Sequence, residues 1–115
     1  MVKIDDYSFG RIVIDGKLYT SDVIIYPDRV RSNWWRIEGH KLAIDDIKEV
    51  LEYSPEILII GTGAYGVMRV PEDVRKYIED RGIKTIILPT REACKKFNEL
   101  ISKGKRVVAA LHLTC

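Results

Sequence analysis

The sequence has no long apolar run, and its longest one covers only residues 107–111. A membrane-spanning helix needs about 18 or more consecutive apolar residues, so we expect no membrane partner. The first residues combine neither a cationic start nor an apolar stretch, so no secretory signal is expected. The two cysteines have neither the density of a disulfide framework nor metal-ligand spacing. We therefore expect a cytoplasmic location, and no metal or other cofactor.

Neither sign of charge dominates, since 19 basic and 17 acidic residues leave a net charge of +2. Without a strong overall field, the chain does not predict nucleic acid as a partner. The content of 46% apolar and 31% charged residues is typical of a soluble globular protein. A length of 115 residues fits one domain, residues 1–115, which can bury about two-thirds of its unfolded surface.

The first third of the chain predicts β-structure. Asp15-Gly16 between two short strands suits the left-handed φ angles of a two-residue hairpin turn. A β-branched run follows and stops at a Pro-Asp turn signal, and the next segment is expected to pair back on it. The four predicted strands are residues 11–14, 17–20, 23–26 and 30–35.

The rest of the chain predicts alternating helices and strands. Helical spacing of apolar residues begins at Ile44 and ends before Ser54-Pro55. Because helical crossovers join parallel strands right-handedly, the following β-α-β-α-β order predicts a parallel sheet. Its expected members are strand 57–60, helix 71–81, strand 83–88, helix 90–101 and strand 107–113.

Both later helices have predicted buried faces. The first should begin at Pro71 and bury Val74, Tyr77 and Ile78. The second should be capped by Thr90. Its expected apolar face is Ala93, Cys94, Phe97, Leu100 and Ile101.

A glycine-rich loop follows strand 57–60, and residues 61–66 (GTGAYG) fit the G-x-G-x-x-G pattern of dinucleotide-binding loops. Such a loop needs a helix that begins inside the motif and an acid at the end of the next strand. Here four residues separate Gly66 from Pro71, and Leu88-Pro89-Thr90 replaces the acid. The pattern therefore favours a tight turn over a dinucleotide site, and binding of a smaller anion by the loop amides stays open.

The carboxyl ends of the three predicted parallel strands should meet at one edge of the sheet, where ligands bind in open α/β folds. The candidate ligand-binding residues there are Gly61, Thr62, Gly63, Thr90 and His112. His112 is either an acid or base near neutral pH or a hydrogen-bonded structural group. No Ser-His-Asp set, metal cluster or P-loop lysine can be assembled, so no catalytic residue is assigned.

A basic aromatic segment at residues 29–41 is the second unusual feature. Adjacent tryptophans on a strand face opposite sides, so at most one should be buried in the core. An exposed Trp among arginines in a chain of balanced charge favours a protein contact over a nucleic-acid platform. The candidate interface residues are Arg31, Trp34, Trp35, Arg36 and His40.

The order of several motifs resembles the archaeal Mth-type domain family. They are Trp35-Arg36 with Gly39-His40, Gly61-Thr62-Gly63, Thr90-Arg91-Glu92-Ala93 with Asn98, and His112-Leu113-Thr114-Cys115. That family includes the mammalian adipogenesis-associated Mth-domain protein and, more distantly, a mitochondrial complex I assembly factor. The resemblance implies a three-layer α/β fold with a mixed central sheet and a β-hairpin extension, but no catalytic residues.

Two functions follow from these observations. The first is a non-enzymatic protein-binding or assembly module, with a protein partner and with homo-oligomerisation left open. The second is a small anionic ligand-binding protein or enzyme with its site at the carboxyl edge of the parallel strands.

Overall fold

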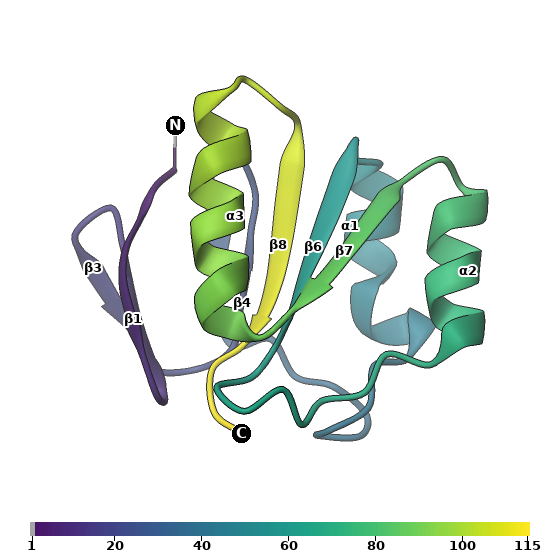
Figure 1. Cartoon of the computed structure of the whole chain (residues 1–115), viewed down its shortest axis with the longest axis horizontal. Helices are drawn as coiled ribbons and strands as arrows, with labels where there is room; N and C mark the ends of the chain where they lie inside the picture. The colour runs from purple at the N-terminus through teal and green to yellow at the C-terminus, as the bar shows by residue number, and fades with distance from the viewer. Residues whose placement is uncertain (1) are drawn as a thin grey trace.

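The computed structural model describes residues 2–115 as an α/β fold with two sheets (Figure 1). The smaller sheet has the order β1-β2-β3 and the larger one β5-β4-β8-β6-β7. The strands are β1 Ile4–Ser8, β2 Arg11–Ile14, β3 Lys17–Tyr19, β4 Val23–Ile25, β5 Val30–Arg31, β6 Ile57–Thr62, β7 Lys84–Leu88 and β8 Val107–His112. The helices are the 3₁₀ turn η1 Ile44–Ile47, α1 Lys48–Tyr53, α2 Glu72–Asp80 and α3 Thr90–Ser102.

The larger sheet is mixed, as the family resemblance implied. β8, β6 and β7 are parallel, with β6 in the middle and in unbroken register with both neighbours. β4 adds antiparallel to β8, and β5 adds antiparallel to β4. The parallel arrangement places the ends of β6, β7 and β8 at one edge of the sheet, as the β-α-β-α-β order predicted.

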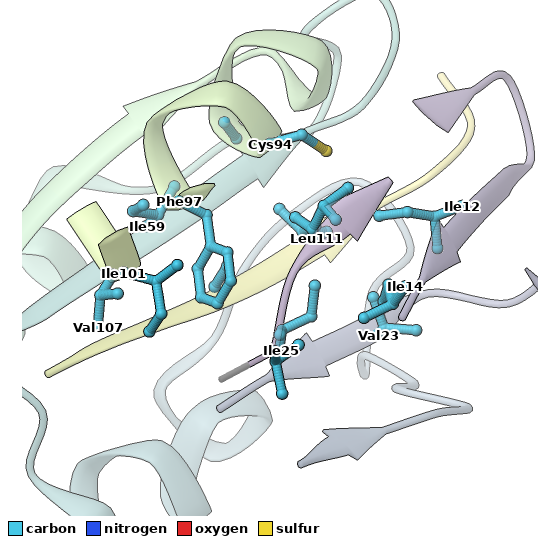
Figure 2. Close-up of a cluster of buried hydrophobic side chains, with 14 of the residues drawn as sticks. Ile12, Ile14, Val23, Ile25, Ile59, Cys94, Phe97, Ile101, Val107 and Leu111 are labelled. Carbon is cyan, nitrogen blue, oxygen red and sulfur yellow. The ribbon is translucent and has the colours of Figure 1, made fainter. Parts of the chain in front are cut away.

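The larger sheet lies between two layers. On one face, α3 and the small sheet enclose a core that includes Phe97, Ile12 and Leu111 (Figure 2). On the other face, the η1–α1 segment and α2 cover a second core that includes Leu58 and Trp34. Side chains of β8 alternate between the two cores, as expected for a strand buried on both faces. The predicted three-layer fold is confirmed.

Local signals explain several of these elements. Asp15 and Gly16 have φ angles of 49° and 78°, which confirms the predicted two-residue hairpin turn. Ser54 takes a left-handed φ of 57° and ends α1, one residue before Pro55. The predicted apolar face of α3 is buried throughout.

Four details differ from the sequence-based expectations. β1 was not predicted, because Asp5-Asp6 interrupts its apolar alternation. The strand expected at residues 30–35 stops at Arg31, because Asn33 has a positive φ of 57°. Tyr77 was expected in the buried face of α2 but is 46% exposed. Thr90 does not cap α3, since no side-chain cap bond is made and Pro89 occupies the N-cap position.

Candidate functional site

The carboxyl edge of the parallel strands brings Gly63, Thr90 and His112 together. The Thr90 hydroxyl accepts a hydrogen bond from the Gly63 amide at 2.8 Å and donates one to the His112 carbonyl at 2.6 Å. The Thr90 side chain is fully buried and therefore links β6, the start of α3 and β8. This role explains why Thr90 is unavailable as a helix cap.

The glycine loop is packed against residues 113–115 of the same chain. Gly63 has a φ of 103°, and a Cβ added there would lie 2.5 Å from the Cys115 carbonyl oxygen. The amides of Ala64 and Val67 donate to the carbonyls of Thr114 and Cys115 at 2.6 and 3.1 Å. These loop amides are thus engaged within the chain rather than free to bind an anion.

The other two loop candidates are also committed to internal contacts. Gly61 allows close packing, because a Cβ there would lie 2.7 Å from a Leu111 methyl group and 2.9 Å from the Thr90 hydroxyl. The Thr62 hydroxyl donates to the Leu88 carbonyl at 3.2 Å. The five predicted ligand-binding residues therefore lie close together, as expected, and their polar groups stabilise the meeting of β6, β7 and β8.

A buried ionic cluster of Asp22, Arg36 and His112 lies beside this edge. Arg36 Nη1 lies 2.9 Å from Asp22 Oδ2, and His112 Nδ1 lies 2.8 Å from the same oxygen. The side chains of Arg36 and His112 are only 5% and 7% exposed. Arg36 also donates through Nε and Nη2 to the Gly39 carbonyl at 3.0 and 2.8 Å. The cluster therefore fixes residues 36–39 against β8.

Asp22 is the acceptor at the centre of this cluster. Burial opposes its ionisation, but hydrogen bonds from His112, the Leu113 amide and Arg36 outweigh that effect and hold the pKa of the carboxyl group below its usual value. His112 Nδ1 lies between this carboxylate, at 2.8 Å, and Arg36 Nη2, at 2.9 Å, so the ring contacts both charged partners through one atom. His112 Nε2 is buried and has no hydrogen-bond partner among the described residues. Asp22 was missed from the sequence because its partners lie 14 and 90 positions away.

His40 and Cys115 approach the cluster from outside. The ring centroids of His40 and His112 are 5.7 Å apart, and Cys115 Sγ lies 3.8 Å from His40 Nε2. Within residues 2–115, no group of three or more His, Cys, Asp or Glu side chains is arranged to hold a metal ion.

The segment after β5 separates the two tryptophans. Trp34 is 1% exposed, and its Nε1 donates to the Asp46 carbonyl at 2.8 Å. Trp35 is 78% exposed, and Ile37 is 73% exposed. Arg36 lies between these two exposed side chains in sequence, and its guanidinium carbon is 4.7 Å from the Trp34 ring centroid. We call residues 34–37 the tryptophan loop; it is anchored by Trp34 and Arg36 and exposes the two residues that alternate with them.

An open surface hollow of about 590 Å³ lies beside the tryptophan loop. It is lined by loop residues and by polar side chains of η1 and α1, including Asp45, Asp46, Lys48, Glu49 and Glu52. Arg31 pairs with Glu49 at 2.6 Å, and Lys48 pairs with Asp45 at 3.4 Å. Glu52 has no ion-pair partner within residues 2–115, so the hollow carries unpaired negative charge.

The structure divides the five predicted interface residues into two groups. Trp34 and Arg36 are buried and hold the loop in place. Trp35, Arg31 and His40 retain exposed surface, and His40 lies at the carboxyl edge rather than beside the hollow. Ile37 was not predicted as an interface residue, although its position two residues after Trp35 could have indicated that role.

The mixed five-stranded sheet between two layers defines a Mth938-like α/β domain, a class also seen in solved structures. The chain is similar in structure to a conserved hypothetical protein from Pyrococcus horikoshii OT3, with a TM-score of 0.85 and 34% identity. This match covers 98% of this chain and 99% of the other one. It also shares the fold of a Mth938-like domain from Bordetella pertussis, with a TM-score of 0.69 and 18% identity over 96% of this chain and 85% of that one.

The chain belongs to the family described as protein of unknown function (DUF498/DUF598), whose model matches residues 4–112. It is similar to NADH dehydrogenase [ubiquinone] 1 alpha subcomplex assembly factor 3 from Mus musculus, with 31% identity over 117 residues, and from Xenopus tropicalis, with 27% over 111. These matches cover 96% and 94% of this chain but only 60% and 59% of the relatives. From residue 2 onward, no helix combines the length and apolar character needed to cross a membrane.

Proposed function

We propose that this chain is a non-enzymatic protein-binding or assembly module that contacts its partner through the tryptophan loop. The observation that carries the proposal is the 78% exposure of Trp35 between Trp34, which is 1% exposed, and Arg36, whose side chain is 5% exposed. A large aromatic side chain exposed on a rigid support loses little conformational freedom on binding, so its burial contributes to affinity with little offset. The names of the curated relatives, which are assembly factors, support the same general role.

The surroundings of the loop indicate the chemistry of the partner. Trp35 and Ile37 require an apolar pocket on the partner, since both are aliphatic or aromatic and mostly exposed. The unpaired Glu52 beside them favours a cationic group at the rim of that pocket. We therefore propose a protein partner with an apolar pocket and at least one basic residue beside it, and we do not propose nucleic acid.

Affinity capture with three forms of the chain tests this proposal. Wild type, Trp35→Ala and Leu18→Ala are used as baits in extract of the source cells, and the captured proteins are quantified. Leu18 is the matched control because it is 50% exposed on β3, outside the tryptophan loop. We expect the same protein to be captured by wild type and Leu18→Ala but not by Trp35→Ala. Equal capture by all three folded baits would show that the tryptophan loop is not the interface.

A small anionic ligand at the carboxyl edge is the second candidate. The buried His112 Nε2 favours it, because this atom has no hydrogen-bond partner within the described chain and can donate to an anion when it carries a proton. The engaged amides of Ala64 and Val67 weigh against it, because an anion would have to displace residues 113–115. A thermal-shift screen with phosphates, nucleotides and carboxylates tests this candidate, since a ligand at 100 times its Kd adds about 2.7 kcal/mol. A shift that is abolished by His112→Ala would support it, and the absence of any shift would count against it.

A further inference from the structure

The outer edge of β7 is the one long, unprotected edge of the larger sheet. β7 is the last strand in the order of that sheet and pairs with β6 over five consecutive residues without a bulge. Its residues Thr85, Ile86, Ile87 and Leu88 are all half-buried, and only Lys84 is fully exposed. Figure 1 shows β7 at the front of the molecule, with no other described element drawn in front of it. Its two faces are covered, but its edge is open.

The other three edge strands that the structure describes, β1, β3 and β5, are protected in the ways that proteins usually use. β1 carries two charged residues, Asp5 and Asp6, and its register is irregular at that point. β5 contains only two residues, and one of them is the charged Arg31. β3 contains three residues and begins with Lys17. Short strands and charged side chains prevent another strand from adding to an edge. β7 contains five residues, and its central three, Thr85, Ile86 and Ile87, include neither a proline nor a charged residue.

The direction of the free backbone groups follows from the pairing with β6. The Lys84 amide donates to the Glu56 carbonyl at 3.0 Å and therefore points toward β6. Because alternate residues of a strand direct their amides and carbonyls to opposite sides, those of Ile86 and Leu88 also point toward β6. The amides and carbonyls of Thr85 and Ile87 point away from the sheet. The edge thus offers two donors and two acceptors to a further strand.

We propose that two copies of this chain pair antiparallel through β7, which extends the five-stranded sheet across a two-fold axis at Ile86. In this register Thr85 lies opposite Ile87 of the second copy, and Ile87 lies opposite its Thr85. Each of these two pairs exchanges two backbone hydrogen bonds, so all four outward groups of each copy are satisfied. A register centred on any other β7 residue pairs Thr85 or Ile87 with a residue outside β7. The edge is therefore complementary to itself.

The charges and the geometry favour a second copy as the occupant. Lys84 is the single charged residue of β7, and the proposed register places it opposite Leu88 rather than opposite a second lysine. Because the same edge is used on both sides, the contact closes at a dimer and does not propagate. An interface of one strand edge is small, so we expect a dissociation constant of about 1–100 µM.

Sedimentation of the intact chain and two variants tests the proposal. Wild type should sediment at twice the 13.2 kDa mass of the chain at high concentration and at 13.2 kDa after dilution. Thr85→Pro removes an outward amide without removing a bond to β6, and it should be monomeric. Thr85→Lys keeps that amide but places two lysines diagonally across the two-fold axis, and its dissociation constant should rise at least about tenfold. Leu18→Lys on β3 adds the same charge elsewhere and should dimerise like wild type.

Residue-resolved hydrogen exchange provides the second measurement. The amides of Thr85 and Ile87 should exchange more slowly as the protein concentration rises, whereas Ile86, bonded within the chain, should not change. The proposal is overturned if wild type stays monomeric at several times the highest expected dissociation constant. It is also overturned if both Thr85 variants, shown to be folded, dimerise as tightly as wild type.

Discussion

Replacement of Arg36 by leucine should destabilise the protein far more than replacement of an exposed arginine. The Arg36 side chain is 5% exposed, pairs with Asp22 at 2.9 Å and donates twice to the Gly39 carbonyl. Removing one partner of a buried ion pair costs about 3–5 kcal/mol, because the remaining charge is left without compensation. That loss is a large fraction of the roughly 5–15 kcal/mol by which a domain is stable.

Urea unfolding followed by circular dichroism measures this loss. With a slope of about 1.5 kcal/mol per molar urea, the unfolding midpoint of Arg36→Leu should fall by about 2–3 M. Arg31→Leu is the matched control, because Arg31 also pairs with a carboxylate, Glu49 at 2.6 Å, but is 48% exposed. An exposed pair contributes about 0–1 kcal/mol, so the control should shift by less than about 0.7 M.

If Arg36→Leu and Arg31→Leu lose equal stability, the Asp22–Arg36–His112 cluster does not hold the tryptophan loop, and the rigidity attributed to that loop has no basis. A variant with Asp22→Leu as well as Arg36→Leu should regain part of the loss, because it removes the uncompensated carboxylate.

Three further predictions concern stability and thiol chemistry. Gly63→Ala should lower the melting temperature by at least about 4–8 °C, because Gly63 has a φ of 103° and a Cβ there would clash with Cys115. Gly16→Ala is the control and should lower the melting temperature less, because a Cβ at Gly16 would have no atom within 4 Å. The pKa of Asp22 is lower in the folded than in the unfolded chain, so the stability that its ionised form contributes is present above about pH 4 and is lost as the pH falls. The free energies of unfolding of wild type and Asp22→Asn, measured between pH 3 and 7, should therefore converge at the acid end. Burial raises the pKa of Cys94 to about 12, so native protein at pH 8 should be alkylated there roughly 10³-fold more slowly than unfolded protein, a difference that mass spectrometry detects.

The sequence predicted the parallel half of the fold well because its signals are local. Helical spacing and turn residues placed the helices and strands from residue 44 onward, and the β-α-β-α-β order implied parallel strands. β1 could not be predicted, because a register irregularity at Asp5 and Asp6 places the buried Ile4 and Tyr7 three positions apart, which breaks the two-residue alternation of a regular strand. Its position depends on Asn98, which exchanges two hydrogen bonds with the Ile4 backbone from 94 residues away.

The candidate site shows the same limit. The meeting of Gly63, Thr90 and His112 could be predicted, because the ends of parallel strands share an edge. The packing of residues 113–115 against the glycine loop could not, because no local pattern specifies which backbone carbonyl accepts a given amide. The burial of Arg36 was also hidden, since an arginine in a basic segment is usually exposed. Its burial depends on the distant Asp22.

The affinity of the captured partner for wild type and Trp35→Ala tests the central claim most directly. Trp35 is 78% exposed in the free chain, and truncation of an aromatic side chain at the centre of an interface typically costs 2 kcal/mol or more. We therefore predict that the dissociation constant measured by calorimetry rises by at least about 30-fold for Trp35→Ala and by less than about threefold for Leu18→Ala. A partner that binds Trp35→Ala and wild type with equal affinity would contradict the account.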